Sequence, residues 1–176
     1  MQNKFNDVFN LVTNDILKDC VSKIVGEKMI TIKKAEVESI AGPSLNFITD
    51  GIFRISGTAY TQESEVPWSL VLKIIKQAEE EKNNPMHHNY WKREALVNQT
   101  NILNEFADVF YVPQCYKVEE KDNGSIWLWM EEIKLNNQLD WSKEDFAFIA
   151  RQLGIFNAIY LNKHIVHKEP WICQQW

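Results

Sequence analysis

The chain has 176 residues, of which 45% are hydrophobic and 24% charged, and its formal net charge is −5. This balance is typical of a globular domain with a real core, and it excludes a disordered tail. The acidic charge, without a basic stripe, argues against binding to nucleic acid and, less strongly, against binding to anionic membranes.

The number of cysteines and the lack of long apolar segments indicate where in the cell the protein is located. Three widely spaced cysteines, Cys20, Cys115 and Cys173, cannot close a full disulfide framework. A reducing cytoplasm is therefore the expected location. The first residues lack the apolar run of a signal peptide, and no apolar stretch approaches the roughly 18 residues of a membrane span.

The first half of the chain changes from helical to alternating periodicity. Apolar residues at three- and four-residue spacing predict a helical region over 5–24, with a cap at Thr13 or Asn14 and an end at Gly26. Three antiparallel strands are then expected, over residues 29–40, 51–60 and 68–75. A polar turn over 62–67 joins the last two strands.

The second half begins with a charged, solvated loop over 76–89. One apolar stripe predicts a helix over 90–107. Two strands that flank an Asn-Gly hairpin turn follow, over residues 114–120 and 125–132. A last helix is expected over 143–162, with Ser142 as its cap and Asp145 at the third helical position.

The order of these elements predicts an α+β fold. It consists of a five-stranded antiparallel sheet with one helix between the third and fourth strands, an N-terminal helix and a C-terminal helical segment. We expect three parts: a helical segment over 1–27, the sheet region over 28–133, and a linker with the last helix over 134–176.

Lys73 lies inside the apolar strand 68–75. By strand alternation it shares a face with Ser69, Val71 and Ile75. A buried ammonium must be paired or directed at a cavity, because an isolated one costs too much free energy. Two plainer interpretations are an edge-strand lysine that guards against aggregation and a lysine whose stem reaches water.

A partner for Lys73 is available on the next helix. Glu94 lies on the border of the buried face of that helix, so a helix packed on the sheet would present its carboxylate to Lys73. The alternative is an exposed glutamate that pairs with Asn98 or with water.

The fifth strand ends in an acidic segment, 130–133. Where a strand ends beside a cleft, its free backbone N–H and C=O groups can bind the edge of a flat heterocycle. The alternative is a core strand followed by an acidic turn.

These three features resemble, in their order along the chain, the N-terminal lobe of protein-kinase-like enzymes. The details look more like the aminoglycoside-phosphotransferase branch, which phosphorylates small molecules. The similar runs are residues 68–73, 90–95 and 153–158, and the likeness spans residues 28–176. The resemblance implies that residues 28–133 form a nucleotide-binding lobe and that 134–176 hold the first helix of a C-terminal lobe.

The resemblance also implies roles for single residues. Lys73 would hold the α- and β-phosphates of ATP, and Glu94 would hold Lys73 in place. Met130 would lie at the back of the adenine pocket, and Val71 would press on the ring.

The edge of the adenine would meet the Glu131 carbonyl and the Ile133 amide. A loop over 41–50 would cover the phosphates, where Pro43 removes one amide donor and Ser44 and Asn46 substitute as donors.

No catalytic residue and no metal ligand is assigned to this chain. It lacks the His-x-Asp loop that orients the acceptor hydroxyl and the later aspartate that holds Mg²⁺. Asp145 only mimics the latter, because it lies inside a predicted helix. His164, His167 and Cys173 offer three possible metal ligands, but a helix end with a polar tail explains the same residues.

We therefore expect the ATP-binding lobe of a phosphotransferase that acts on a small-molecule hydroxyl. The catalytic lobe, with the Mg²⁺ ligands, would be missing, so the chain alone would be inactive. The alternative is a non-catalytic nucleotide-sensing or protein-interaction module. A third option is a stable remnant without a ligand. As such a module or remnant, the chain would have a last helix without its packing partner, and the apolar face of that helix would drive self-association through Phe146, Ile149, Leu153 and Phe156.

Overall fold

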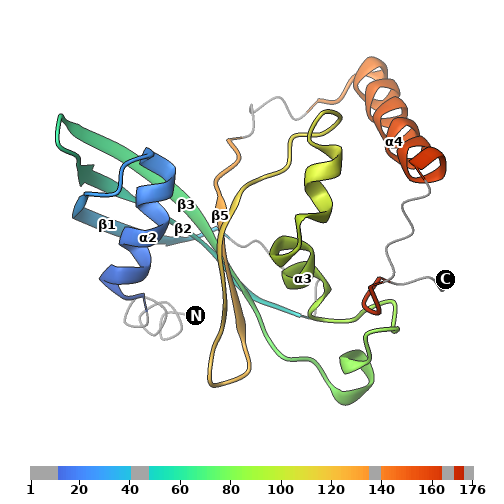
Figure 1. Cartoon of the computed structure of the whole chain (residues 1–176), viewed down its shortest axis with the longest axis horizontal. Coiled ribbons are helices and arrows are strands. Elements are labelled where there is room, and N and C mark those ends of the chain that lie inside the picture. The colour runs from blue at the N-terminus through green and yellow to red at the C-terminus, as the bar shows by residue number, and fades with distance from the viewer. Residues whose placement is uncertain (1–11, 41–47, 135–139, 164–168, 173–176) are drawn as a thin grey trace. The chain divides into compact units, whose positions relative to one another are not determined.

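The computed structural model describes residues 12–40, 48–134, 140–163 and 169–172. The chain divides into two compact units, unit 1 (residues 1–77 and 114–132) and unit 2 (residues 78–113 and 133–176). The described residues form an α+β fold with a five-stranded antiparallel sheet and three α-helices (Figure 1).

The sheet belongs to unit 1, and its strand order is β1-β2-β3-β5-β4. The strands are β1 (Thr31–Ser39), β2 (Thr49–Tyr60), β3 (Glu65–Ile75), β4 (Cys115–Glu120) and β5 (Ile126–Glu131). All neighbours are antiparallel. The predicted fold class and all five strands are confirmed, and β3 is the central strand.

The start of β3 was predicted too late, because Pro67 reads as a strand breaker. Pro67 is instead paired with Thr58 inside β3. β5 pairs with β3 only from Leu70 onward. Pro67 therefore has no neighbouring strand on that side, and the amide hydrogen that proline lacks is not needed there. The turn between β2 and β3 is correspondingly shorter than predicted.

The helix α2 (Asn14–Val25) covers one face of the sheet (Figure 1). The Thr13 hydroxyl accepts a hydrogen bond from the Ile16 amide (3.4 Å), and the helix ends at Gly26 with a φ of 80°. The predicted cap and end are thereby confirmed. The predicted helical residues 5–11 lie outside the described part of the chain.

Beneath α2 lies the hydrophobic core of unit 1. The residues buried in it come from alternate positions of β2, β3 and β5, and from α2: Leu17, Cys20, Val21, Phe53, Ile55, Ala59, Trp68, Leu70, Leu72, Ile74, Trp127 and Trp129. The strand residues between them point to the opposite face, since side chains alternate along a strand.

Both edge strands of the sheet carry charged side chains. β1 holds Lys33, Lys34, Glu36 and Glu38, and β4 holds Lys117, Glu119 and Glu120. On β4, the Glu119 carboxylate accepts a hydrogen bond from the Trp129 indole (2.7 Å) and pairs with Lys117 and Lys121.

Unit 2 contains the 3₁₀ turn η1 (Glu80–Asn83), the helix α3 (Arg93–Gln99), the 3₁₀ turn η2 (Asn101–Phe106) and the helix α4 (Lys143–Lys163). The single helix predicted over 90–107 is therefore divided. Thr100 breaks it with an extended backbone (φ −95°, ψ 154°), because Thr and the surrounding Asn residues favour a helix only weakly.

Arg93 organises the segment before α3. Its guanidinium donates to the main-chain carbonyls of Pro85, His87, His88 and Trp171, at 2.6–3.2 Å. Nearby in sequence, Trp91 and Ala95 are buried, as the predicted stripe requires.

The helix α4 begins as predicted. Ser142 and Asp145 bind each other reciprocally through their side chains and amides, at 2.8–3.2 Å. In α4 the Phe156 ring centroid lies 4.6 Å from that of Phe106 and 5.6 Å from that of Phe110, and the Phe146 ring centroid lies 5.6 Å from that of Trp141. None of the helices in the described part of the chain is long and apolar enough to cross a membrane.

Candidate functional site

Lys73 lies on the face of the sheet opposite α2. Its direct neighbours across the strands are Ile52 in β2 and Leu128 in β5, and its own side chain is half-buried. Because β3 is the central strand, the edge-strand interpretation of Lys73 is wrong. An ammonium at the middle of a sheet, between two apolar side chains, is placed to bind an anion on that face.

Val71 and Met130 lie on the same face as Lys73. Val71 is opposite Met130 in β5 and opposite Arg54 in β2, and Arg54 is opposite Glu38 in β1. Residues directly opposite in neighbouring strands project to the same face. We call the half-buried surface of Arg54, Val71, Lys73 and Met130 the Lys73 face. It joins two apolar side chains to two cations.

Glu131 closes the end of β5. Its amide donates to the Gln114 carbonyl (2.8 Å), and its carboxylate accepts from the Gln114 amide (3.1 Å). The side chain of Glu131, rather than its own carbonyl, therefore receives the Gln114 amide. These two bonds fix the strand end to the residue that precedes β4.

Glu94 and Ile133, two other predicted site residues, belong to unit 2. Glu94 is half-buried in the first turn of α3, and Ile133 is exposed. Asn98 donates to the main-chain carbonyl of Glu94 (2.8 Å). The pairing of Glu94 with Lys73 joins residues of different units and stays a prediction. Ser44 and Asn46 lie outside the described residues.

Arg54 was not predicted as a site residue. Its Nε donates to Glu132 (2.5 Å) and its Nη1 to Glu38 (2.9 Å). These hydrogen bonds, above all the one to Glu132, raise the pKa of the guanidinium. A signal was present in the sequence, because β2 alternates between apolar residues and the polar positions Arg54, Ser56 and Thr58. Its acidic partners are distant in sequence and gave no such signal.

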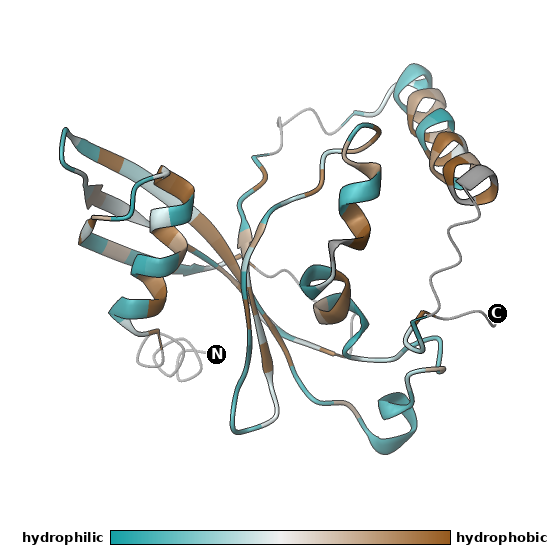
Figure 2. Cartoon of the chain, in the orientation of Figure 1, coloured by the Kyte–Doolittle hydropathy of each residue, from teal (hydrophilic) through white to brown (hydrophobic). Residues whose placement is uncertain are grey.

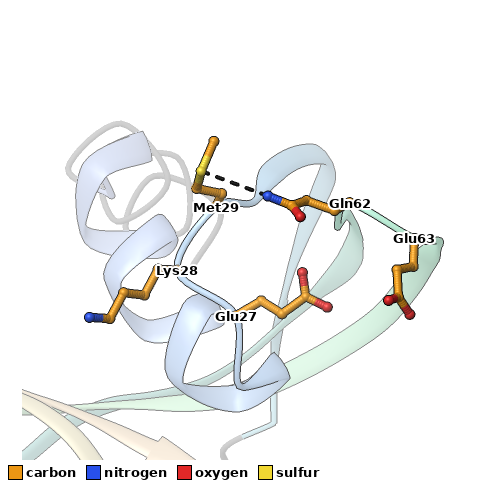
Figure 3. Close-up of a pocket in the computed structure, with 5 residues that line it drawn as sticks. All are labelled: Glu27, Lys28, Met29, Gln62 and Glu63. Atoms are coloured by element: carbon orange, nitrogen blue, oxygen red, sulfur yellow. Dashed lines mark hydrogen bonds between the residues drawn. The ribbon is translucent and has the colours of Figure 1, made fainter.

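A shallow hollow lies elsewhere on unit 1, between the end of α2 and the turn that joins β2 to β3 (Figure 3). It encloses about 350 Å³ and is lined by Glu27, Lys28, Met29, Gln62 and Glu63. The Gln62 amide donates to the Met29 sulfur (3.9 Å). The hollow includes none of the predicted site residues, and its lining is mostly exposed.

The described part of the chain offers no cluster of metal ligands. No group of three or more His, Cys, Asp or Glu residues there is arranged to hold an ion. His164, His167 and Cys173 lie outside the described residues. The carboxylate of Asp145 is bound by Ser142, and these hydrogen bonds lower its pKa.

Comparison with known proteins leaves the family open. No family model, no curated protein and no solved structure matches the chain. Function is therefore inferred from the residues and the fold alone.

Proposed function

We propose that unit 1 binds ATP on the Lys73 face and is the nucleotide-binding lobe of a kinase-like phosphotransferase. The full enzyme would transfer the γ-phosphoryl group to the hydroxyl of a small molecule. In this proposal the protein is cytoplasmic, its partners are ATP and that acceptor, and it binds neither nucleic acid nor membranes.

The observation that carries the proposal is the placement of Lys73 beside Val71 and Met130. A lysine on the central strand supplies a point charge for phosphate oxygens. Val71 and Met130, opposite each other two residues along the same strands, supply an apolar floor for a flat base. The five antiparallel strands, with a helix between the third and fourth, agree with the resemblance.

The remaining roles in the proposal are carried over from the resemblance. The end of β5 at Glu131, fixed by Gln114, would meet the edge of the base. Glu94 and Ile133 keep their predicted roles as the partner of Lys73 and as an amide donor to the base. The Mg²⁺ that accompanies ATP has no ligand cluster among the described residues, so no step is assigned to it.

The alternative function is a non-catalytic module that senses nucleotide or docks another protein. The exposed apolar side chains of α4 favour it, since a docking helix needs such a surface. ATP binding without any phosphoryl transfer, in the longest natural form of the protein, would support this alternative.

Isothermal titration calorimetry with ATP tests the proposal. We expect saturable binding by the natural chain and its loss in Lys73→Ala, because the phosphates lose their cation. Unchanged ATP binding in Lys73→Ala would show that the binding site does not lie on this face.

Lys76→Ala is the matched control. Lys76 is an exposed lysine just beyond the end of β3, so its removal changes the net charge by the same amount. We expect it to leave ATP affinity within about twofold, because exposed charges are screened by salt.

A further inference from the structure

Arg54 lies in one row with the apolar floor of the Lys73 face. The row crosses four strands, from Glu38 through Arg54 and Val71 to Met130. Neighbouring strands lie about 4.8 Å apart, so a bicyclic purine placed over Val71 also reaches a neighbouring strand. On the β2 side, the side chain that it meets is Arg54.

Two carboxylates hold Arg54, and they differ in exposure. The Glu132 side chain is 10% exposed and its bond to Nε measures 2.5 Å, whereas the Glu38 side chain is 65% exposed and its bond to Nη1 measures 2.9 Å. A less exposed ion pair is screened less by water and salt. Glu132 is therefore the carboxylate that fixes the guanidinium.

Glu132 also has a special position along the chain. It directly follows β5, so its bond to Arg54 attaches the end of that strand to β2. The guanidinium is thus oriented before any ligand arrives. A planar guanidinium stacks well on an aromatic ring, and an oriented one loses less side-chain entropy on binding.

On the basis of the proposed function, we infer that Arg54 is a further nucleotide-contacting residue, which stacks on the nucleobase. Glu132 is the positioning residue that holds its guanidinium over the ring. Lys73 binds the phosphates and Arg54 the base, so the two cations of the Lys73 face act on different parts of one ligand.

Calorimetric titrations with ATP and with adenosine separate the two cations. Arg54→Met, which keeps an apolar stem, is expected to weaken binding of both ligands by about tenfold, the usual effect of removing one stacking side chain. Arg54→Lys should weaken both to a similar degree, because it keeps the charge and loses the plane. Lys73→Met should weaken ATP binding and leave adenosine binding unchanged.

Three results would overturn the inference and leave the proposed function intact. They are ATP binding without adenosine binding by the natural chain, a loss confined to ATP in Arg54→Met, and unchanged binding of both ligands in that variant. Absence of ATP binding by the natural chain would instead remove the proposed function, and the inference with it.

A second pair of variants tests the role of Glu132. Glu132→Gln and Glu38→Gln each remove one negative charge beside Arg54. We expect Glu132→Gln to weaken adenosine binding about threefold or more and Glu38→Gln to leave it unchanged, in line with their exposure. Equal effects would contradict the positioning role, and matching circular dichroism spectra would show that each variant is folded.

Discussion

Leu70 and Val71 are neighbours in β3 and face opposite sides of the sheet. Leu70 is fully buried beneath α2, whereas Val71 is half-buried on the Lys73 face. One strand thus carries the core on one side and the candidate site on the other.

We expect Leu70→Ala to lower the free energy of unfolding by about 2–5 kcal/mol, because it leaves a cavity in the core. Val71→Ala should cost about 1 kcal/mol or less and weaken ATP binding. Urea denaturation with parallel ATP titration measures both effects. Equal losses of stability in the two variants would contradict the assignment of the faces.

Gly57 has no room for a side chain. A Cβ at Gly57 in β2 would collide with the main-chain carbonyl of Lys34 in β1, beside the irregular register of that pair. Gly57→Ala should therefore destabilise the protein by about 1–3 kcal/mol, which thermal unfolding detects.

Gly154→Ala is the control. Gly154 lies in α4 with nothing within 4 Å of its added Cβ, so alanine should stabilise the helix by about 0.5–1 kcal/mol. Unchanged stability in Gly57→Ala would argue against the close pairing of β1 with β2 at this point.

Cys20 is fully buried, and burial raises the pKa of its thiol from 9.0 to about 12. Since the thiolate is the reactive form, iodoacetamide at neutral pH should modify the half-buried Cys115 well before Cys20. Peptide mass mapping distinguishes the two sites. Rapid labelling of Cys20 in the folded protein would contradict its burial.

The raised pKa of the Cys20 thiol also makes the stability of the fold depend on pH. The unfolded state loses its Cys20 proton near pH 9.0 and the folded state only near pH 12, so the free energy of unfolding should fall as the pH rises through this window. Burial raises the pKa of Tyr116 as well, which adds in the same direction. Urea denaturation between about pH 8 and 11 measures this effect. In Cys20→Ala, the free energy of unfolding should fall less steeply with pH than in the natural chain.

The exposed hydrophobic side chains of α4 indicate that the chain self-associates. Its exposed hydrophobic side chains are Phe146, Phe148, Ile149, Leu153, Ile155 and Leu161, and Figure 2 shows hydrophobic stretches recurring along it. Sedimentation velocity should show a species that grows with protein concentration. A monodisperse monomer at high concentration would contradict this.

Leu153→Glu should shift the chain toward the monomer, because a charge replaces an exposed apolar contact. Arg151→Glu, at an exposed polar position of the same helix, is the control; it changes the net charge more than Leu153→Glu does and should still leave the association unchanged.

Local signals predicted most of the fold. Thr13 and Gly26 delimit α2, and Ser142 with Asp145 begins α4, because each of these groups acts within a few residues of its partner. Strand alternation likewise placed Lys73 and Val71 on one face.

Other features depend on residues distant in sequence and could not be predicted in the same way. Pro67 fits inside β3 only because β5 pairs with β3 from Leu70 onward. The hydrogen bond from Arg54 to Glu132 joins residues 78 positions apart. Such pairs are determined by the strand order, which the sequence pattern alone leaves open.

The charged edge strands have a consequence for assembly. A second molecule that added a strand beside β1 or β4 would bring its own backbone against rows of lysines and glutamates, where pairing is disfavoured. Sheet-to-sheet polymerisation of this chain is thus discouraged at both ends. Any oligomer that it forms should therefore use surfaces other than the two edges of the sheet.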